Sequence, residues 1–206
     1  MLSMKKTLLG LTAAAALGAF ATGAQATVLN ARMTVDNSFS LYISTDANQL
    51  GTLVGGGDNW QTAYNFGINL APNQTHYLHI VANDVGVISA FLGQFSLSDD
   101  LFAFSNGSQN LFTNTSDWTV NRTGFANAGN APIAYGYYGQ QIWGAQSGLS
   151  SMSGNAQWIW DASGCTYCTA YFSTTISAVN AVPEPATVAT LGLGLLGLAG
   201  LRRRKA

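Results

Sequence analysis

The chemistry open to this 206-residue chain starts with its two cysteines, which stand in the run Cys165-Thr166-Tyr167-Cys168. This spacing suits either a redox motif or a short disulfide. A redox cysteine needs a helix after it to lower the thiol pKa, and the sequence predicts none here. We therefore expect a disulfide between Cys165 and Cys168, worth about 2 kcal/mol of stability in the chain-entropy model. Two cysteines are too few for a closed zinc site.

Residues suited to acid–base catalysis are scarce. Glutamate is absent between residues 27 and 182, and the neighbours Asp99 and Asp100 diverge on a strand. The odd separation of His76 and His79 places them on opposite strand faces, so we expect satisfied structural histidines. No Gly-x-Ser-x-Gly nucleophile motif occurs. We expect no enzyme, and a hydrolase module with paired aspartates is the alternative.

Calcium is the ion that the aspartates could hold, because hard cations prefer carboxylate, carbonyl and amide oxygens. Turns also favour aspartate without any metal, so solvated turn residues are the alternative. We expect no cofactor, leave a structural Ca²⁺ open and assign no ligand set. The aspartates in predicted loops are Asp36, Asp46, Asp58, Asp84 and Asp161.

The five tryptophans offer surfaces that could stack on sugar rings. Trp158 and Trp160 lie two apart on one strand, and we expect at least one of them in the core. Core packing is the alternative reading for every tryptophan. The aromatic residues expected at the surface, and hence the candidate glycan-binding residues, are Trp60, Tyr137, Tyr138 and Trp143.

Charge argues against one class of partner. Between residues 27 and 182 two arginines stand against eight aspartates, which gives a formal charge of −6 with no lysine. Nucleic acids and anionic membranes are bound by basic patches. We therefore expect neither as a partner of the domain.

Strands must position these residues, because period-two alternation recurs along the chain and helical periodicity does not. Residues 125–154 predict a long ordered loop with at most one strand, and the run Gly55-Gly56-Gly57 predicts a turn. Short strands at this spacing predict an all-β fold, an antiparallel β-sandwich of the jelly-roll type. The predicted strands are 28–35, 38–44, 63–70, 77–82, 87–97, 111–113, 118–122, 157–160 and 169–178.

Several stretches resemble the galactose-binding-like jelly-roll modules found beside glycoside hydrolases. The similar stretches are 36–43 with Trp60-Gln61, 77–82 with 90–93, 114–118, and 156–160 with Tyr171-Phe172. The sequence departs from the pattern at 44–50, where an Asn-Gly hairpin is usual, and at Ser173, where an arginine is usual. The resemblance implies the jelly-roll fold and leaves the ligand open.

The N-terminus reads as a signal peptide, residues 1–26. Lys5-Lys6 is the basic region, 8–21 is the apolar region, and Ala24-Gln25-Ala26 fits the cleavage site before Thr27. Met4 is an alternative start. We therefore expect export through the Sec translocon.

The C-terminal segment, residues 182–206, has three parts. Pro183-Glu184-Pro185 favours an extended backbone that ends the preceding fold. Residues 186–201 carry no charge, and as a helix they would span about 24 Å, a little less than a bilayer core. The basic run 202–205 would stay cytoplasmic. The glycines of 192–197 fit a dinucleotide-binding pattern, but that pattern needs a soluble helix.

This arrangement resembles the PEP-CTERM sorting signal. The resemblance implies recognition by an exosortase, a membrane-embedded cysteine peptidase that would cut near Pro183-Glu184-Pro185 and remove the helix and the basic tail. A permanent single-span anchor is the alternative. The expected partners are the Sec translocon, exosortase, the inner membrane transiently, and an exopolysaccharide or another matrix glycan.

The sequence thus predicts one β-sandwich domain, residues 27–181, between two sorting segments. We expect a protein carried across the inner membrane to the cell surface or extracellular matrix, where the domain binds a glycan or another matrix component. A purely structural surface protein without a ligand is one alternative, and a carbohydrate-active hydrolase is another.

Overall fold

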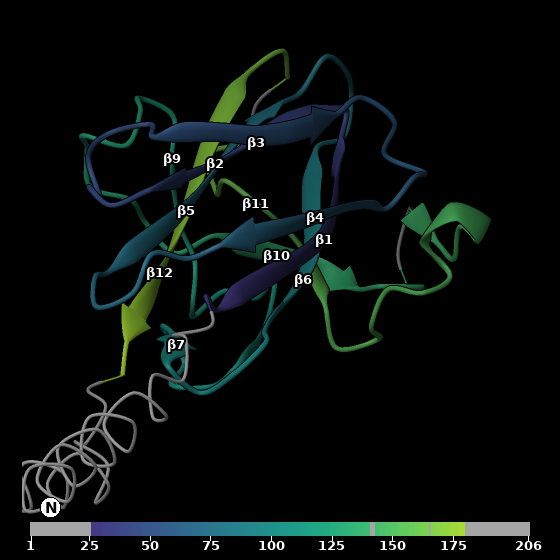
Figure 1. Ribbon diagram of the computed structural model, residues 1–206. Coiled ribbons are helices and arrows are strands. Elements are labelled where there is room, and N and C mark those ends of the chain that lie inside the picture. The colour runs from purple at the N-terminus through teal and green to yellow at the C-terminus, as the bar shows by residue number, and fades with distance from the viewer. Residues whose placement is uncertain (1–25, 141–142, 165, 180–206) are drawn as a thin grey trace, which may run out of the picture.

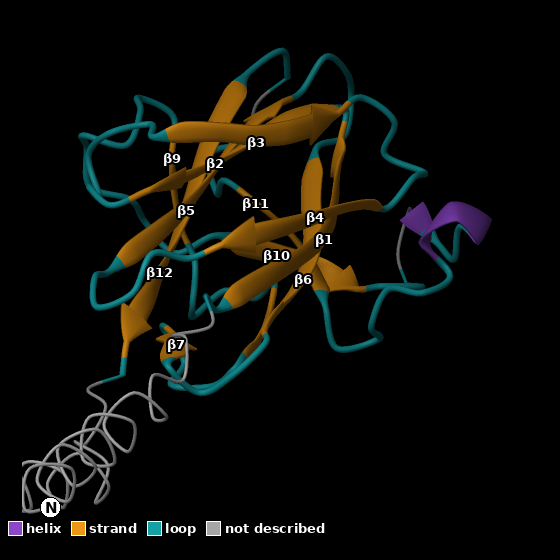
Figure 2. Cartoon of the chain, viewed as in Figure 1, coloured by secondary structure: helices purple, strands orange, loops and turns teal. Residues whose placement is uncertain are grey.

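The computed structural model describes residues 26–140, 143–164 and 166–179, which form two antiparallel sheets packed against each other (Figures 1 and 2). The first sheet contains, in spatial order, β10 (Ile133–Tyr137), β11 (Gln157–Trp160), β6 (Ala90–Leu97), β1 (Val28–Asp36) and β4 (Tyr64–Asn69). Its sixth strand, β8 (Asn110–Phe112), pairs with β6. The second sheet contains, in spatial order, β3 (Thr52–Gly57), β2 (Ser38–Ser44), β5 (His76–Asn83), β12 (Thr169–Ala178) and β7 (Phe102–Phe104). Its sixth strand, β9 (Thr119–Asn121), pairs with β12.

The all-β expectation is confirmed. Within the described ranges, no helix is long and apolar enough to cross a membrane. The helix predicted at 186–201 lies outside the described residues, and so does the predicted signal peptide except for Ala26. The segment 125–154 holds β10 and the short 3-10 helix η3 (Ser147–Leu149), in agreement with a long loop carrying one strand.

The main core lies between the two sheets because alternate strand residues point inward. Aromatic rings join the sheets: the ring centroid of Phe91 lies 5.1 Å from those of Trp118 and Phe172. β1 contributes Leu29, Ala31, Met33 and Val35, and β5 contributes Leu78, Ile80 and Ala82.

The glycine run at residues 55–57 belongs to β3, so the turn predicted there is wrong. β3 pairs with β2, and its glycines lie where two rings of β4 approach the backbone. A Cβ at Gly55 would meet the ring of Phe66, and one at Gly57 would overlap the ring of Tyr64. Glycine in a strand commonly marks such a close approach.

Replacing Gly57 with alanine is therefore expected to destabilise the domain by about 1–3 kcal/mol, the usual cost of overpacking. The ring of Tyr64 would have to move, and its hydroxyl holds the backbone N–H groups of Asp58 and Asn59 at 3.3 and 3.2 Å. Gly67→Ala is the matched control, since its Cβ would meet nothing closer than 4.0 Å. Urea unfolding measures both variants, and equal losses would contradict the account.

The two ends of the domain meet at one turn. The N–H of Ser98 donates to the carbonyl of Val28 at 3.0 Å, and the N–H of Val179 donates to the carbonyl of Leu101 at 2.8 Å. The described ranges thus contain both sheets, their common core and both closing strands. This organisation supports producing residues 27–182 as a folded unit.

Candidate functional site

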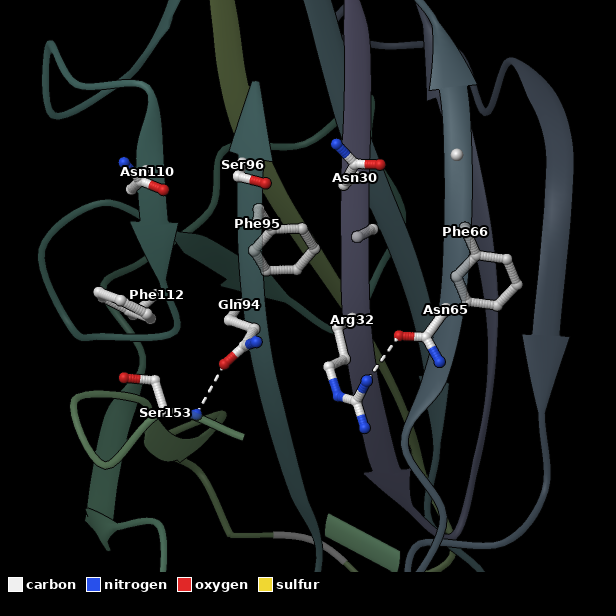
Figure 3. A pocket seen from close by; sticks show the side chains of 12 residues that line it. Asn30, Arg32, Asn65, Phe66, Gln94, Phe95, Ser96, Asn110, Phe112 and Ser153 are labelled. Atoms are coloured by element: carbon white, nitrogen blue, oxygen red, sulfur yellow. Dashed lines mark hydrogen bonds between the residues drawn. The ribbon is translucent and has the colours of Figure 1, made fainter. Parts of the chain in front are cut away.

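The outer face of the first sheet carries a polar groove of about 620 Å³, called the outer groove below (Figure 3). Its side chains come from four neighbouring strands, and residues two apart on each strand point into it because core-facing residues alternate with them. The groove-facing strand residues are Asn30 and Arg32 of β1, Asn65 and Gly67 of β4, Gln94 and Ser96 of β6, and Asn110 and Phe112 of β8.

Strand register sets these residues in two rows across the sheet. One row, called the Asn30 row, runs through Gly67, Asn30, Ser96 and Asn110. The other, called the Arg32 row, runs through Asn65, Arg32, Gln94 and Phe112. Neighbouring strands lie about 4.8 Å apart, so the side chains of each row lie next to one another, except at Gly67, which has none.

The Arg32 row is held in place by hydrogen bonds. Nη1 of Arg32 donates to Oδ1 of Asn65 at 3.0 Å. Oε1 of Gln94 accepts from the backbone N–H of Ser153 at 2.6 Å, and its Nε2 donates to the carbonyl of Ser151 at 3.4 Å. The 151–153 segment therefore forms one wall of the groove, and this row is preorganised.

The Asn30 row offers free polar groups. The side chains of Asn30, Ser96 and Asn110 form no hydrogen bond with any other described residue. Asn30 and Asn110 are exposed and Ser96 is half-buried. Two amides and a hydroxyl can each donate and accept, which suits a ligand rich in hydroxyl groups.

The rest of this sheet face is covered by residues 138–140 and 143–156, whose apolar side chains form a second cluster with those of the sheet. The rings of Trp143 and Trp158 stack there with centroids 4.9 Å apart and an interplanar angle of 20°. Thr34, on the same face of β1, donates to the carbonyl of Trp60 at 3.0 Å. The buried members of this second cluster are Ala90, Leu92, Trp143, Leu149, Met152, Ala156 and Trp158.

The expectation that Trp143 is exposed is wrong, because its exposed fraction is 3%. The loop packs its ring onto the second cluster, and its Nε1 donates to Oδ2 of Asp36 at 3.0 Å. Trp60 and Tyr138 are half-buried beside the same cluster, whereas Tyr137 is 45% exposed. None of these four residues lines the outer groove. Glycan contact by Trp60, Tyr137 and Tyr138 stays a prediction.

The sequence interpretation missed the residues of the outer groove. The available signal was polar alternation: Asn30 and Arg32 are two apart, as are Gln94 and Ser96. Such alternation equally describes any solvated sheet face. Only the pairing of β4, β1, β6 and β8 brings the residues together.

The aspartates considered for calcium are dispersed. Asp36 is the last residue of β1, so its placement in a loop is wrong, and it is buried. Asp84 and Asp161 are also buried, while Asp46 and Asp58 are exposed. In the part of the chain that the structure describes, no group of three or more His, Cys, Asp or Glu could hold a metal ion. A structural Ca²⁺ held by other oxygens stays untested.

Asp36 has an unusual environment for a carboxylate. Burial raises its pKa above the ordinary 3.8, the hydrogen bond from Trp143 lowers it in part, and the charge of Asp84 raises it further. Asp84 is itself fixed by the backbone N–H groups of Gly86 and Tyr167, at 2.9 and 3.1 Å. The protonated form of Asp36 therefore favours the folded state.

An Asp36→Asn variant is expected to change the pH dependence of stability. The folded-state pKa of Asp36 is raised, so the stability that its protonated carboxyl contributes to the wild type is fully present below pH 3.8. That stability is lost as the pH rises through the folded-state pKa. The variant keeps an acceptor for Trp143 without the charge, so its relative stability should improve as pH rises. Unfolding measured from pH 3 to 8 checks this, with carboxyl ¹³C NMR locating the pKa. A titration midpoint of Asp36 below 3.8 in the folded protein would contradict this prediction.

The two histidines differ in their surroundings. Nε2 of His76 lies 2.8 Å from the carbonyl of Ala71, so this histidine is satisfied as expected. His79 is fully buried and stacks on Phe125 with centroids 3.9 Å apart. Neither of its ring nitrogens makes a hydrogen bond of regular geometry, so the expectation of a satisfied histidine is wrong for His79, although the backbone groups of Leu50 and Gln49 lie close enough to act on its pKa. Burial lowers the pKa of His79, and the backbone of Leu50 partly offsets this by raising it.

The predicted disulfide cannot be placed in full, because Cys165 lies outside the described residues. Pro183-Glu184-Pro185 and the cleavage-site residue Ala24 lie outside them too, whereas Ala26, the last residue of the predicted signal peptide, is described and exposed. These assignments stay predictions on structural grounds.

The fold and the groove define a two-sheet domain with a polar surface cleft. Residues 181–205 match the family of the PEP-CTERM protein-sorting motif, which confirms the sorting signal predicted at 182–206. The motif covers the tail only and says nothing about the β domain. No curated protein and no solved structure matches the chain.

Proposed function

We propose that this is an extracellular matrix protein whose β domain binds a polysaccharide in the outer groove. The observation that carries the proposal is the Asn30 row, where Asn30, Ser96 and Asn110 present free amide and hydroxyl groups over three strands. The half-buried ring of Phe112 adds an apolar edge to the same groove. Binding sites for sugars combine these elements: a concave surface, a few placed polar groups and an aromatic face.

The sorting motif supports the location. A PEP-CTERM signal implies export, transient anchoring in the inner membrane and processing by an exosortase, followed by release to the cell surface or matrix. The signal peptide proposed for residues 1–26 would bring the chain to the Sec translocon. The matrix is rich in polysaccharide, so a glycan site would have its ligand at hand. The galactose-binding-like jelly-roll assignment remains part of this proposal.

The positions of the acidic residues support binding rather than catalysis. A hydrolase needs two carboxylates that flank a substrate in an open cleft. Asp36 and Asp84 interact electrostatically, but their exposed fractions are 8% and 4%. The outer groove has no acidic residue among those that line it. We therefore propose that the protein is not an enzyme.

The test is a glycan array probed with residues 27–182 and with an Asn30→Ala/Asn110→Ala double variant. Each lost hydrogen bond is worth about 1 kcal/mol, so the double variant should bind at least about 10-fold more weakly. Asn69→Ala is the matched control, because Asn69 is exposed on the groove-facing side of β4 and does not line the groove. Binding of the double variant at wild-type strength, or no wild-type binding to any polysaccharide, would overturn the proposal.

A structural surface protein without a ligand is the second candidate. One observation favours it: the buried tryptophans serve packing, and they are Trp118, Trp143, Trp158 and Trp160. This candidate requires self-association of the domain. Sedimentation velocity over a 100-fold concentration range tests it, and a monomer throughout would remove the candidate.

A further inference from the structure

No acidic residue among those that line the outer groove balances the positive charge at its centre. Arg32 stands in the middle of its row, between Asn65 and Gln94 (Figure 3). It is one of two basic residues between residues 27 and 182. Within the described ranges its side chain makes one hydrogen bond, to Asn65, and its Nε is buried without a partner. None of the residues that line the groove is acidic.

A half-buried guanidinium is normally matched by a carboxylate or a phosphate. Its planar fork of donors fits such an anion through two parallel hydrogen bonds. Here the amide of Asn65 occupies Nη1 and supplies no negative charge. The wall formed by Gln94 and the 151–153 segment is neutral as well. The groove therefore presents one cation among uncharged amides and hydroxyls.

We propose that the outer groove selects an acidic glycan, one whose sugars carry a carboxylate or a sulfate that binds Arg32. This inference rests on the proposed function of the groove. The acidic group would lie on the Arg32 row, and hydroxyl groups of the same chain would lie on the Asn30 row. The two rows are two residues apart along each strand, about 7 Å. An acidic sugar and its neighbour can therefore contact both rows.

The same charges disfavour other polyanions. Nucleic acid is bound by many cations at once, and this groove holds a single arginine. The formal charge of −6 over residues 27–182 repels a densely charged chain at long range. At physiological salt that repulsion is screened beyond about 8 Å, while a direct contact with Arg32 survives. A sparsely charged acidic polysaccharide satisfies both conditions.

The experiment compares polymers that differ in charge alone. Residues 27–182 are titrated with a sparsely charged, partly esterified polygalacturonate, with its carboxyl-reduced neutral form, and with a lightly sulfated dextran beside neutral dextran. The wild type is expected to bind an acidic polymer at least 10-fold more tightly than its neutral form. A preference in the first pair assigns a carboxylate, and a preference in the second assigns a sulfate.

Variants identify the residue responsible. Arg32→Gln should lose the preference for the acidic form, and Arg32→Lys should retain part of it. Arg122→Gln is the matched control, because Arg122 contacts Ser163 outside the groove and is the other arginine of the domain. Circular dichroism checks that each variant is folded.

The outcomes separate this inference from the proposed function. Equal wild-type binding to acidic and neutral forms would overturn the acidic preference and leave glycan binding intact. An unchanged preference in Arg32→Gln, or its loss in Arg122→Gln, would overturn the role of Arg32. Binding to none of the polymers here or on the glycan array would overturn both.

Discussion

Replacing Trp143 with alanine is expected to lower the free energy of unfolding by about 3–5 kcal/mol, the range for cutting a large aromatic from a core. The ring is 3% exposed and stacks on Trp158, so the second cluster would lose its centre. The buried carboxylate of Asp36 would also lose its indole donor. Far-UV circular dichroism during urea unfolding measures the loss without relying on tryptophan emission.

Two further variants separate the loss of the ring from the loss of the indole N–H donor. Trp143→Phe keeps most of the ring and removes the N–H, so it should cost about 1–3 kcal/mol through the unpaired carboxylate. Tyr137→Ala is the control from the same segment, since Tyr137 is 45% exposed, and it should change stability by at most about 1 kcal/mol. A Trp143→Ala variant as stable as this control would mean that the ring is at the surface after all.

The strands were largely predictable because one face of each is buried. Alternation located β11 and β12 to the residue, and it placed β1 and β5 within one residue of their ends. β3 was missed because its glycine run resembles a turn, and the reason for these glycines lies in the rings of Tyr64 and Phe66, which belong to another strand. Local pattern carries no record of such a contact.

The site was harder to predict than the fold. Trp143 was expected at the surface with other aromatic residues of the long loop, but the outer face of Ala90 and Leu92 is apolar, and burial of that face requires a covering side chain. The loop supplied that cover with its own tryptophan. The outer groove arises from the pairing of strands far apart in the chain, such as β1 with β4 and β6. Composition cannot give that register, so polar residues on four strands looked like ordinary surface.

Changing Pro183, Glu184 and Pro185 together to alanine is expected to block maturation almost completely. The prolines hold the backbone extended, and alanine is the best helix former, so the change would let the helix predicted at 186–201 extend toward the domain. A peptidase that reads an extended motif would lose its substrate. In the producing cells the variant should remain full length in the membrane fraction, with at least 10-fold less released protein.

The control keeps the tail and spares the motif. Alanine at Thr187, Val188 and Thr190 preserves an uncharged helix, so this variant should be processed like the wild type. Intact-mass spectrometry of membrane and extracellular fractions distinguishes the products. A wild-type chain that keeps residues 186–205 in its final form would establish the permanent anchor instead. In that case the outer groove would act beside the membrane, tethered through the end of β12, rather than free in the matrix.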